Sequence, residues 1–107
     1  MKEIRYRLAK PSDAKQIAAI HYGIREQYDV GIFARLGKPF LRRYYSIMLN
    51  DPWEVVVCAE KEGRIMGFSS YTLDAAHQMA VYRKHRLALA FGALPSLIRR
   101  PSLIKLL

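Results

Sequence analysis

WEVVVCAEKEGRIMGFSSYT, residues 53–72, contains two short apolar runs separated by a charged turn. The first run, residues 55–59, is rich in β-branched side chains and too short for an ordinary helix, and the second covers residues 65–68. Gly63 adopts the positive φ of a tight turn at no steric cost, so the two runs predict a β-hairpin. Both strands carry apolar residues on both faces, which predicts a central position with helices covering each side.

The composition limits what surrounds this hairpin. Of the 107 residues, 51% are hydrophobic and 25% are charged, which is typical of a globular chain. A chain of this length supports one domain that buries about two thirds of its unfolded surface, so we expect a single domain over residues 1–107. Cys58 is the single cysteine, which excludes a disulfide within the chain and predicts a reducing, cytoplasmic location. No apolar run approaches the roughly 20 residues that span a bilayer.

The net charge of +9 is concentrated in the last third of the chain. Residues 1–74 carry twelve Lys or Arg against nine Asp or Glu, whereas residues 75–107 carry six basic residues and no acidic one. We therefore divide the expected domain into an α/β part, residues 1–74, and a basic, apolar helical segment, residues 75–107.

Periodicity predicts the elements before the hairpin. Residues 3–8 alternate polar and apolar side chains, which indicates a strand at a sheet edge. A first helix is expected from about Asp13 to Ile24, with Ser12 or Asp13 as its cap and Gln16 in the capping-box position. Residues 25–37 lack periodicity and predict a loop. A second helix is expected to start near Pro39 and to end at residues 50–52.

After the hairpin, Asp74 is expected to cap a third, longer helix that stops near Pro95. The side of this helix that carries Leu87, Phe91 and Leu94 is expected to pack on the protein. Residues 96–107 predict two short helical turns. The expected fold is therefore α/β, with a mixed sheet of three strands in the sequence order strand, helix, helix, strand, strand, helix.

Three stretches carry a family resemblance. IRYRLA with SDA shortly after it (residues 4–14), LGKPFL (36–41) and VCAEKEGRIMGF (57–68) look like the N-terminal half of a GNAT-type N-acetyltransferase. The basic segment resembles an insertion that some bacterial members carry between the third and fourth strands. The resemblance implies acetyl-CoA as the cofactor, and it implies an acceptor pocket lined by the loop between the first two helices and the end of the third strand. It thus points to Tyr28, Phe33 and Tyr71 as substrate-binding residues, with core packing as the alternative.

The chain departs from that family in its cofactor motif. The family binds acetyl-CoA with a Gln/Arg-x-x-Gly-x-Gly/Ala loop that leads into a helix, and these 107 residues contain no such loop. The family's usual general base and its later tyrosine would lie past Leu107, so no catalytic residue is assigned. The resemblance therefore implies the acceptor-side part of an N-acyltransferase, incomplete or inactive alone, whose cofactor half is missing or comes from another chain.

Two other functions compete with the acyltransferase. The first is a non-catalytic binding module that contacts a membrane surface or an anionic partner through Arg83, Lys84, Arg86, Arg99 and Arg100. A pI near 10 also attracts nucleic acid, but no binding motif accompanies the charge. The second is a homodimer in which the free edge of the third strand pairs with its twin.

Four further side chains are of types that can form a site. His77 and His85 are eight residues apart on the expected third helix, but no acidic residue or cysteine follows Asp74 to complete a metal site, so none is assigned. His21 has no nucleophile partner at a recognisable spacing and is interpreted as a packing residue. Cys58 lies within a strand and is interpreted as inert core.

Overall fold

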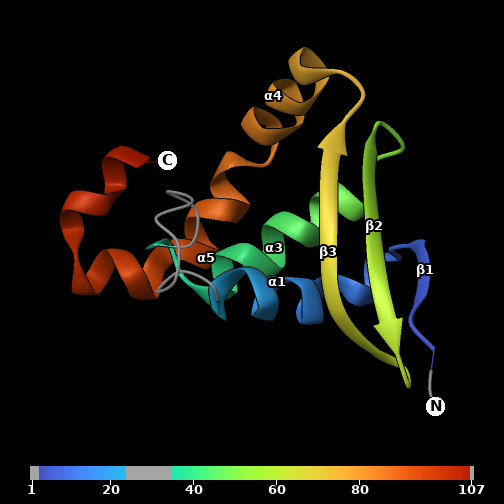
Figure 1. Cartoon of the computed structure of the whole chain (residues 1–107). Coiled ribbons are helices and arrows are strands. Elements are labelled where there is room, and N and C mark those ends of the chain that lie inside the picture. The colour runs from blue at the N-terminus through green and yellow to red at the C-terminus, as the bar shows by residue number, and fades with distance from the viewer. Residues whose placement is uncertain (1–2, 24–34, 107) are drawn as a thin grey trace.

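The computed structural model describes residues 3–23 and 35–106, and residues 25–34 of the predicted loop lie outside them. The fold is α/β, with a three-stranded sheet on one side and the helices on the other (Figure 1). In chain order the elements are β1 (Arg5–Leu8), η1 (Pro11–Asp13), α1 (Ala14–Gly23), α3 (Lys38–Leu49), β2 (Glu54–Lys61), β3 (Arg64–Thr72), α4 (Ala75–Lys84), α5 (Arg86–Arg99) and η2 (Pro101–Leu106).

The three strands form one sheet in the order β1-β2-β3. The predicted hairpin is confirmed as β2 and β3, whereas the predicted mixed sheet is wrong, because both pairings between described strands are antiparallel. Ala59 pairs with Gly67 and Glu60 pairs with Ile65, so Met66 is an extra residue that forms a bulge.

The hairpin turn consists of two residues with positive φ, Glu62 at 54° and Gly63 at 79°. This conformation matches the right-handed twist of the flanking strands, which is why two-residue hairpin loops favour it. Gly63 therefore performs the role that the sequence predicted, while Glu62 adopts the left-handed conformation despite its side chain.

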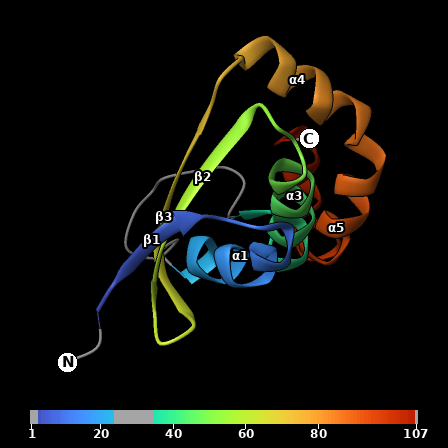
Figure 2. The ribbon, with the colours of Figure 1, turned by 90° about the vertical axis from the view of Figure 1, so that its right-hand side faces the viewer.

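The described helices lie on one side of the sheet, so the cover predicted for the second side is not found among the described residues (Figure 2). α1 packs on β3 and α3 packs on β2, and the buried residues Val56 and Cys58 belong to the covered face. The alternate residues form the opposite face, on which Tyr6, Leu8 and Tyr71 are 75%, 67% and 56% exposed. We call this second surface the open face; antiparallel sheets commonly leave one face to solvent.

The core lies between the covered face and the helices. The predicted second helix is confirmed as α3, which buries Phe40, Leu41, Tyr45 and Met48 and packs against α1, the sheet and α5. α3 begins one residue before the predicted Pro39. The largest fully buried side chains are Phe40, Ile17, Leu36, Leu41, Leu89 and Cys58.

Arg7 lies on the covered face of β1 and joins three elements. Its guanidinium donates to both carboxylate oxygens of Asp13, at 2.8 and 3.1 Å, and its Nε donates to Glu60 at 2.8 Å. Asp13 also accepts the backbone N–H of Lys10 at 2.7 Å. The hydrogen bonds from Arg7 are the main reason that the pKa of Asp13 lies below its usual range. This network fixes the start of α1 on β1 and β2.

The capping box predicted with Gln16 is wrong. The Gln16 side-chain oxygen accepts the backbone N–H of Ile65 at 3.0 Å instead of reaching back along α1. Ile65 is the residue just before the bulge in β3. Gln16 therefore ties α1 to the bulged strand, a contact between residues that are distant in the sequence.

The predicted third helix is two helices. Asp74 caps α4 as predicted, because its Oδ1 accepts the backbone N–H of His77 at 3.1 Å. The helix is interrupted at His85, and α5 continues through Pro95 to Arg99, so the predicted stop at Pro95 is wrong. Proline removes one helical hydrogen bond, and α5 accommodates that loss. The first of the two predicted terminal turns is part of α5, and the second is η2.

α5 packs against α3 through a side lined with small residues. Leu89, Gly92 and Ala93 are buried on this side. A Cβ built on Gly92 would lie 3.0 Å from the Cα of Phe40 and 3.1 Å from the carbonyl oxygen of Pro39. The two helix backbones approach closely at this point because glycine has no side chain.

The opposite side of α5 is exposed, which contradicts the packing side that the sequence predicted. Leu87, Phe91 and Leu94, expected to pack on the protein, are 78%, 68% and 47% exposed. Ile98 extends the same side with 71% exposure. These four residues recur at helical spacing, and we call them the α5 stripe.

Candidate functional site

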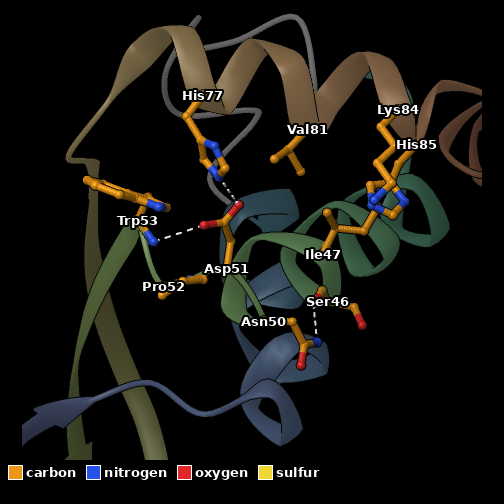
Figure 3. A pocket seen from close by; sticks show the side chains of 10 residues that line it. All are labelled: Ser46, Ile47, Asn50, Asp51, Pro52, Trp53, His77, Val81, Lys84 and His85. Carbon is orange, nitrogen blue, oxygen red and sulfur yellow. Dashed lines mark hydrogen bonds and ion pairs between the residues drawn. The ribbon is translucent and has the colours of Figure 1, made fainter.

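The end of α3, the residues that lead into β2, and α4 line a pocket of about 490 Å³ (Figure 3). Asp51, Trp53 and His77 lie together at one end, and Lys84 and His85 lie at the other. Asp51 and Trp53 line the pocket because α3 ends just before them. His77 lines it because Asp74, three residues earlier, caps α4 and so places His77 in its first turn.

Asp51 is the centre of the hydrogen bonding in this pocket. Its Oδ1 accepts the backbone N–H of Trp53 and its Oδ2 accepts Nε2–H of His77, both at 2.8 Å. The Trp53 amide and, to a lesser degree, the His77 imidazole hold the pKa of Asp51 below its usual range. The Trp53 ring lies 5.9 Å from the His77 ring, so the imidazole is positioned by both neighbours.

Glu54 provides a second carboxyl beside the pocket. Its Oε2 accepts from the side-chain amide of Gln78 at 3.3 Å, while its Oε1 is buried without a hydrogen-bond partner in the described part of the chain. Burial is the main reason that the pKa of Glu54 is raised. A proton on this carboxyl removes the cost of an unpaired buried charge.

The Asp51–His77 pair supports proton transfer. A carboxylate that accepts from one imidazole nitrogen fixes the tautomer and leaves the other nitrogen to exchange protons with a ligand. The same bond also has a structural role, because it connects α4 to the start of β2. Within residues 3–23 and 35–106, no three His, Cys, Asp or Glu side chains are grouped to hold a metal ion.

Replacing His77 by alanine is expected to loosen α4. This helix has no buried residue, and the bonds His77–Asp51 and Gln78–Glu54 connect it to the start of β2. Loss of one such bond costs about 1 kcal/mol, so amide hydrogen exchange in α4 should quicken about fivefold. Met79→Ala, at a half-exposed position of the same helix, is the control. Unchanged exchange in the His77 variant would contradict the role given to this bond.

The substrate-binding residues predicted from the family resemblance are only partly described. Tyr28 and Phe33 lie outside the described residues. Tyr71 lies on the open face beside its partner Val55, near the end of β3 that leads into α4. Tyr71 and the Asp51–His77 pocket are thus at the same end of the sheet but on opposite sides of it, because the pocket is lined by residues of α3 and α4 on the helix side.

The five predicted contact cations are all exposed. Arg83 and Lys84 form the last turn of α4, and Arg86 begins α5. Arg99 and Arg100 lie at the other end of α5, where they line a pocket of about 280 Å³. The cations therefore form two groups at the two ends of the α5 stripe.

His21 and Cys58 have the surroundings that the sequence predicted. His21 Nδ1 and the Tyr45 hydroxyl share a hydrogen bond of 2.8 Å, and burial lowers the pKa of His21. The Cys58 thiol is fully buried and donates to the carbonyl oxygen of Arg7 at 3.6 Å. Burial is the main reason that the pKa of this thiol is raised.

We expect Cys58 to resist thiol reagents in the folded protein. Burial both blocks access and disfavours the reactive thiolate. An aromatic disulfide reagent should release no thiolate from the native chain and one equivalent from the chain in urea. Rapid stoichiometric reaction without urea would show that the centre of the sheet is accessible and would contradict this packing.

Sequence reasoning missed Asp51, Trp53 and Glu54 as parts of a site. Asp51 was interpreted only as part of a helix end, although an Asp-Pro-Trp run after an amphipathic helix was a usable signal. The link to His77 spans 26 residues and depends on where α4 turns back, which no local pattern specifies.

Comparison with protein-family models, with curated proteins and with solved structures finds no match to this chain. Among the described residues, no helix has the length and apolar character needed to cross a membrane. The function must therefore be inferred from the geometry and from the family resemblance.

Proposed function

We propose that this chain is the N-terminal, acceptor-side part of an acetyl-CoA-dependent N-acyltransferase. The observation that carries the proposal is an antiparallel β1-β2-β3 sheet, with the helices α1 and α3 inserted between β1 and β2 and packed on one face. The resemblance to GNAT-type N-acetyltransferases implies an acceptor half of this kind. In the described part of the chain, β3 has no second neighbouring strand, which leaves an edge for further strands.

In this reaction an amine attacks the thioester carbonyl directly, forming the amide bond and releasing the thiolate of CoA. The enzyme orients the two reactants and removes a proton from the amine. Tyr71 is proposed to contact the acceptor from the open face at this end of the sheet, and Tyr28 and Phe33 are proposed to complete the acceptor surface. The Asp51–His77 pair, at the same end of the sheet, is the described group whose chemistry suits that proton.

The cofactor half is assigned to another chain or to residues beyond these 107, because the pyrophosphate-binding loop is not among them. Calorimetric titration of the purified chain with acetyl-CoA, in excess tripolyphosphate so that binding through the phosphates alone is suppressed, and with the solution mass measured on the same sample, tests this division. We expect no saturable binding by the monomer. Micromolar binding, about 8 kcal/mol, by a monomer would overturn it, and a dimeric mass would indicate pairing along the β3 edge.

A second function is favoured by the α5 stripe. Four large apolar side chains exposed between two groups of cations, with no acidic residue after Asp74, are typical of a helix that lies on an anionic membrane surface. A cytoplasmic location, predicted from Cys58, would place this surface against the anionic leaflet.

Vesicle sedimentation distinguishes this function from the acyltransferase. Phe91→Ser should weaken binding to phosphatidylglycerol vesicles about tenfold, because the buried ring contributes about 1.5 kcal/mol or more. Leu73→Ser, at an exposed site outside α5, is the control and should leave binding unchanged. Equal loss in both variants, or no vesicle binding by the parent chain, would exclude the α5 stripe as a membrane contact.

A further inference from the structure

α1 and α3 lie side by side and form a second pocket of about 530 Å³. Lys15 of α1 and Lys38, Arg42 and Arg43 of α3 line it, together with Ser46. Lys38, Arg42 and Ser46 are spaced four residues apart, so they share one side of α3. Four cations thus surround one cavity, and none of them belongs to the predicted contact set of the last third of the chain.

These cations have no acidic partner within the described residues. The ion pairs there join Arg7 to Asp13 and Glu60, and His77 to Asp51. The cavity of the four cations has no carboxylate in its lining. Among the described residues, no carboxylate therefore pairs with the cations of this pocket.

The positions of these cations on α3 are electrostatically unfavourable when no anion occupies the pocket. Like charges four residues apart on a helix, such as Lys38 and Arg42, destabilise it. They also lie in the first turns of α3, where the helix dipole is positive and favours negative charge. Arg43 donates to the carbonyl oxygen of Ala88 of α5 at 3.4 Å, and the Lys38 ammonium lies 5.6 Å from the centre of the Tyr22 ring. An anion in the pocket would relieve both unfavourable terms.

We propose that this pocket binds a ligand that carries two or more phosphate groups. Two phosphates bring three to four negative charges at neutral pH, which matches the four cations. The planar guanidinium of Arg42 suits phosphate oxygens bidentately, the two lysines act as point charges, and the Ser46 hydroxyl is a further donor. The site is separate from the acyl-transfer proposal, because its lining contains neither Tyr71 nor the Asp51–His77 pair.

The test compares two double variants that remove the same charge. Lys15→Gln/Arg42→Gln changes the pocket, and Lys61→Gln/Arg64→Gln changes exposed cations at the ends of the hairpin strands. Tripolyphosphate binding is measured by calorimetry at constant ionic strength, with circular dichroism to confirm folding. The pocket variant should bind about tenfold more weakly than the parent chain, and the hairpin variant less than about twofold more weakly.

A parallel arm separates a free phosphate compound from a lipid headgroup. The same chains are sedimented with phosphatidylcholine vesicles that contain phosphatidylinositol bisphosphate. If the pocket variant alone binds tripolyphosphate more weakly, the ligand is a soluble phosphate compound. If it alone binds only the vesicles more weakly, the ligand is a phosphorylated lipid headgroup. Equal weakening of both variants, or no binding of either probe by the parent chain, would overturn the proposal, since only general attraction by the net charge would then remain.

Discussion

Replacing Phe40 by alanine is expected to lower the free energy of unfolding by about 3 to 5 kcal/mol, the usual cost of truncating a fully buried aromatic side chain. Phe40 is 0% exposed in the first turn of α3 and lies where that helix meets α5. Since a domain of this size is stable by only about 5 to 15 kcal/mol, the variant should lose a large fraction of its stability.

The matched control is Phe91→Ala, which removes the same ring from the α5 stripe. This ring is 68% exposed, so its loss should change stability by less than about 0.5 kcal/mol. Urea unfolding followed by circular dichroism measures both variants. Comparable destabilisation by the two changes would mean that α5 packs through the side that the sequence predicted, and the orientation of α5 described above would be wrong.

Replacing Arg7 by methionine is expected to cost about 2 to 3 kcal/mol of stability at pH 7. Removing one partner of a buried ion pair typically costs about 3 to 5 kcal/mol, and the expected value is lower because the Arg7 side chain is 29% exposed. Asp13, whose side chain is 8% exposed, would keep only the Lys10 amide as a partner. Urea midpoints of the two proteins measure the difference.

The same pair predicts a pH dependence. The folded-state pKa of Asp13 is lowered from its ordinary value near 3.9, so its ionisation stabilises the folded protein fully above about pH 5. This stabilisation is lost as the pH falls through the folded-state pKa. The stability difference between the parent chain and Arg7→Met should therefore narrow from pH 5 to pH 2, while Glu62→Gln, at the exposed turn, should follow the parent. If the stability difference between the two proteins stays constant from pH 5 to pH 2, the ionised Asp13 is not the partner through which Arg7 stabilises the fold.

Local sequence patterns predicted the elements whose determinants are local. The β-branched run of β2 and Gly63 are sufficient to define the hairpin, and Asp74 defines the start of α4. Arg7 could not be placed, because its inward position depends on Glu60, which is 53 residues away. Gln16 was misassigned for the same reason, since its partner Ile65 is 49 residues away.

The orientation of α5 shows a second limit. The helix carries two apolar sides, one with Leu87 and Phe91 and one with Leu89 and Ala93, and hydrophobicity favours the larger residues of the first. Packing selects the second, because Gly92 lets the α5 backbone approach Phe40 of α3. The fit between two helices depends on the side chains of both, so it cannot be predicted from the hydrophobic periodicity of one helix.

The candidate site was predictable only in part. The family resemblance pointed to Tyr71, which lies near the end of β3, and its role in acceptor binding stays a prediction. Asp51 and His77 belong to segments 26 residues apart, and the cations around the α1–α3 pocket come from two helices. Such groupings depend on tertiary packing, so the sequence did not show which of these residues lie together in a site.

The proposed acceptor surface is tested most directly by nuclear magnetic resonance titration of the isotope-labelled chain with primary amines, each paired with its N-acetylated form. We predict that at least one amine shifts the backbone signals around Tyr71 and His77, and that its acetylated form does not, because the product lacks the ammonium group that the acceptor side must recognise. If no amine shifts these signals, or if each amine and its acetylated form shift them equally, the chain is not the acceptor side of an N-acyltransferase.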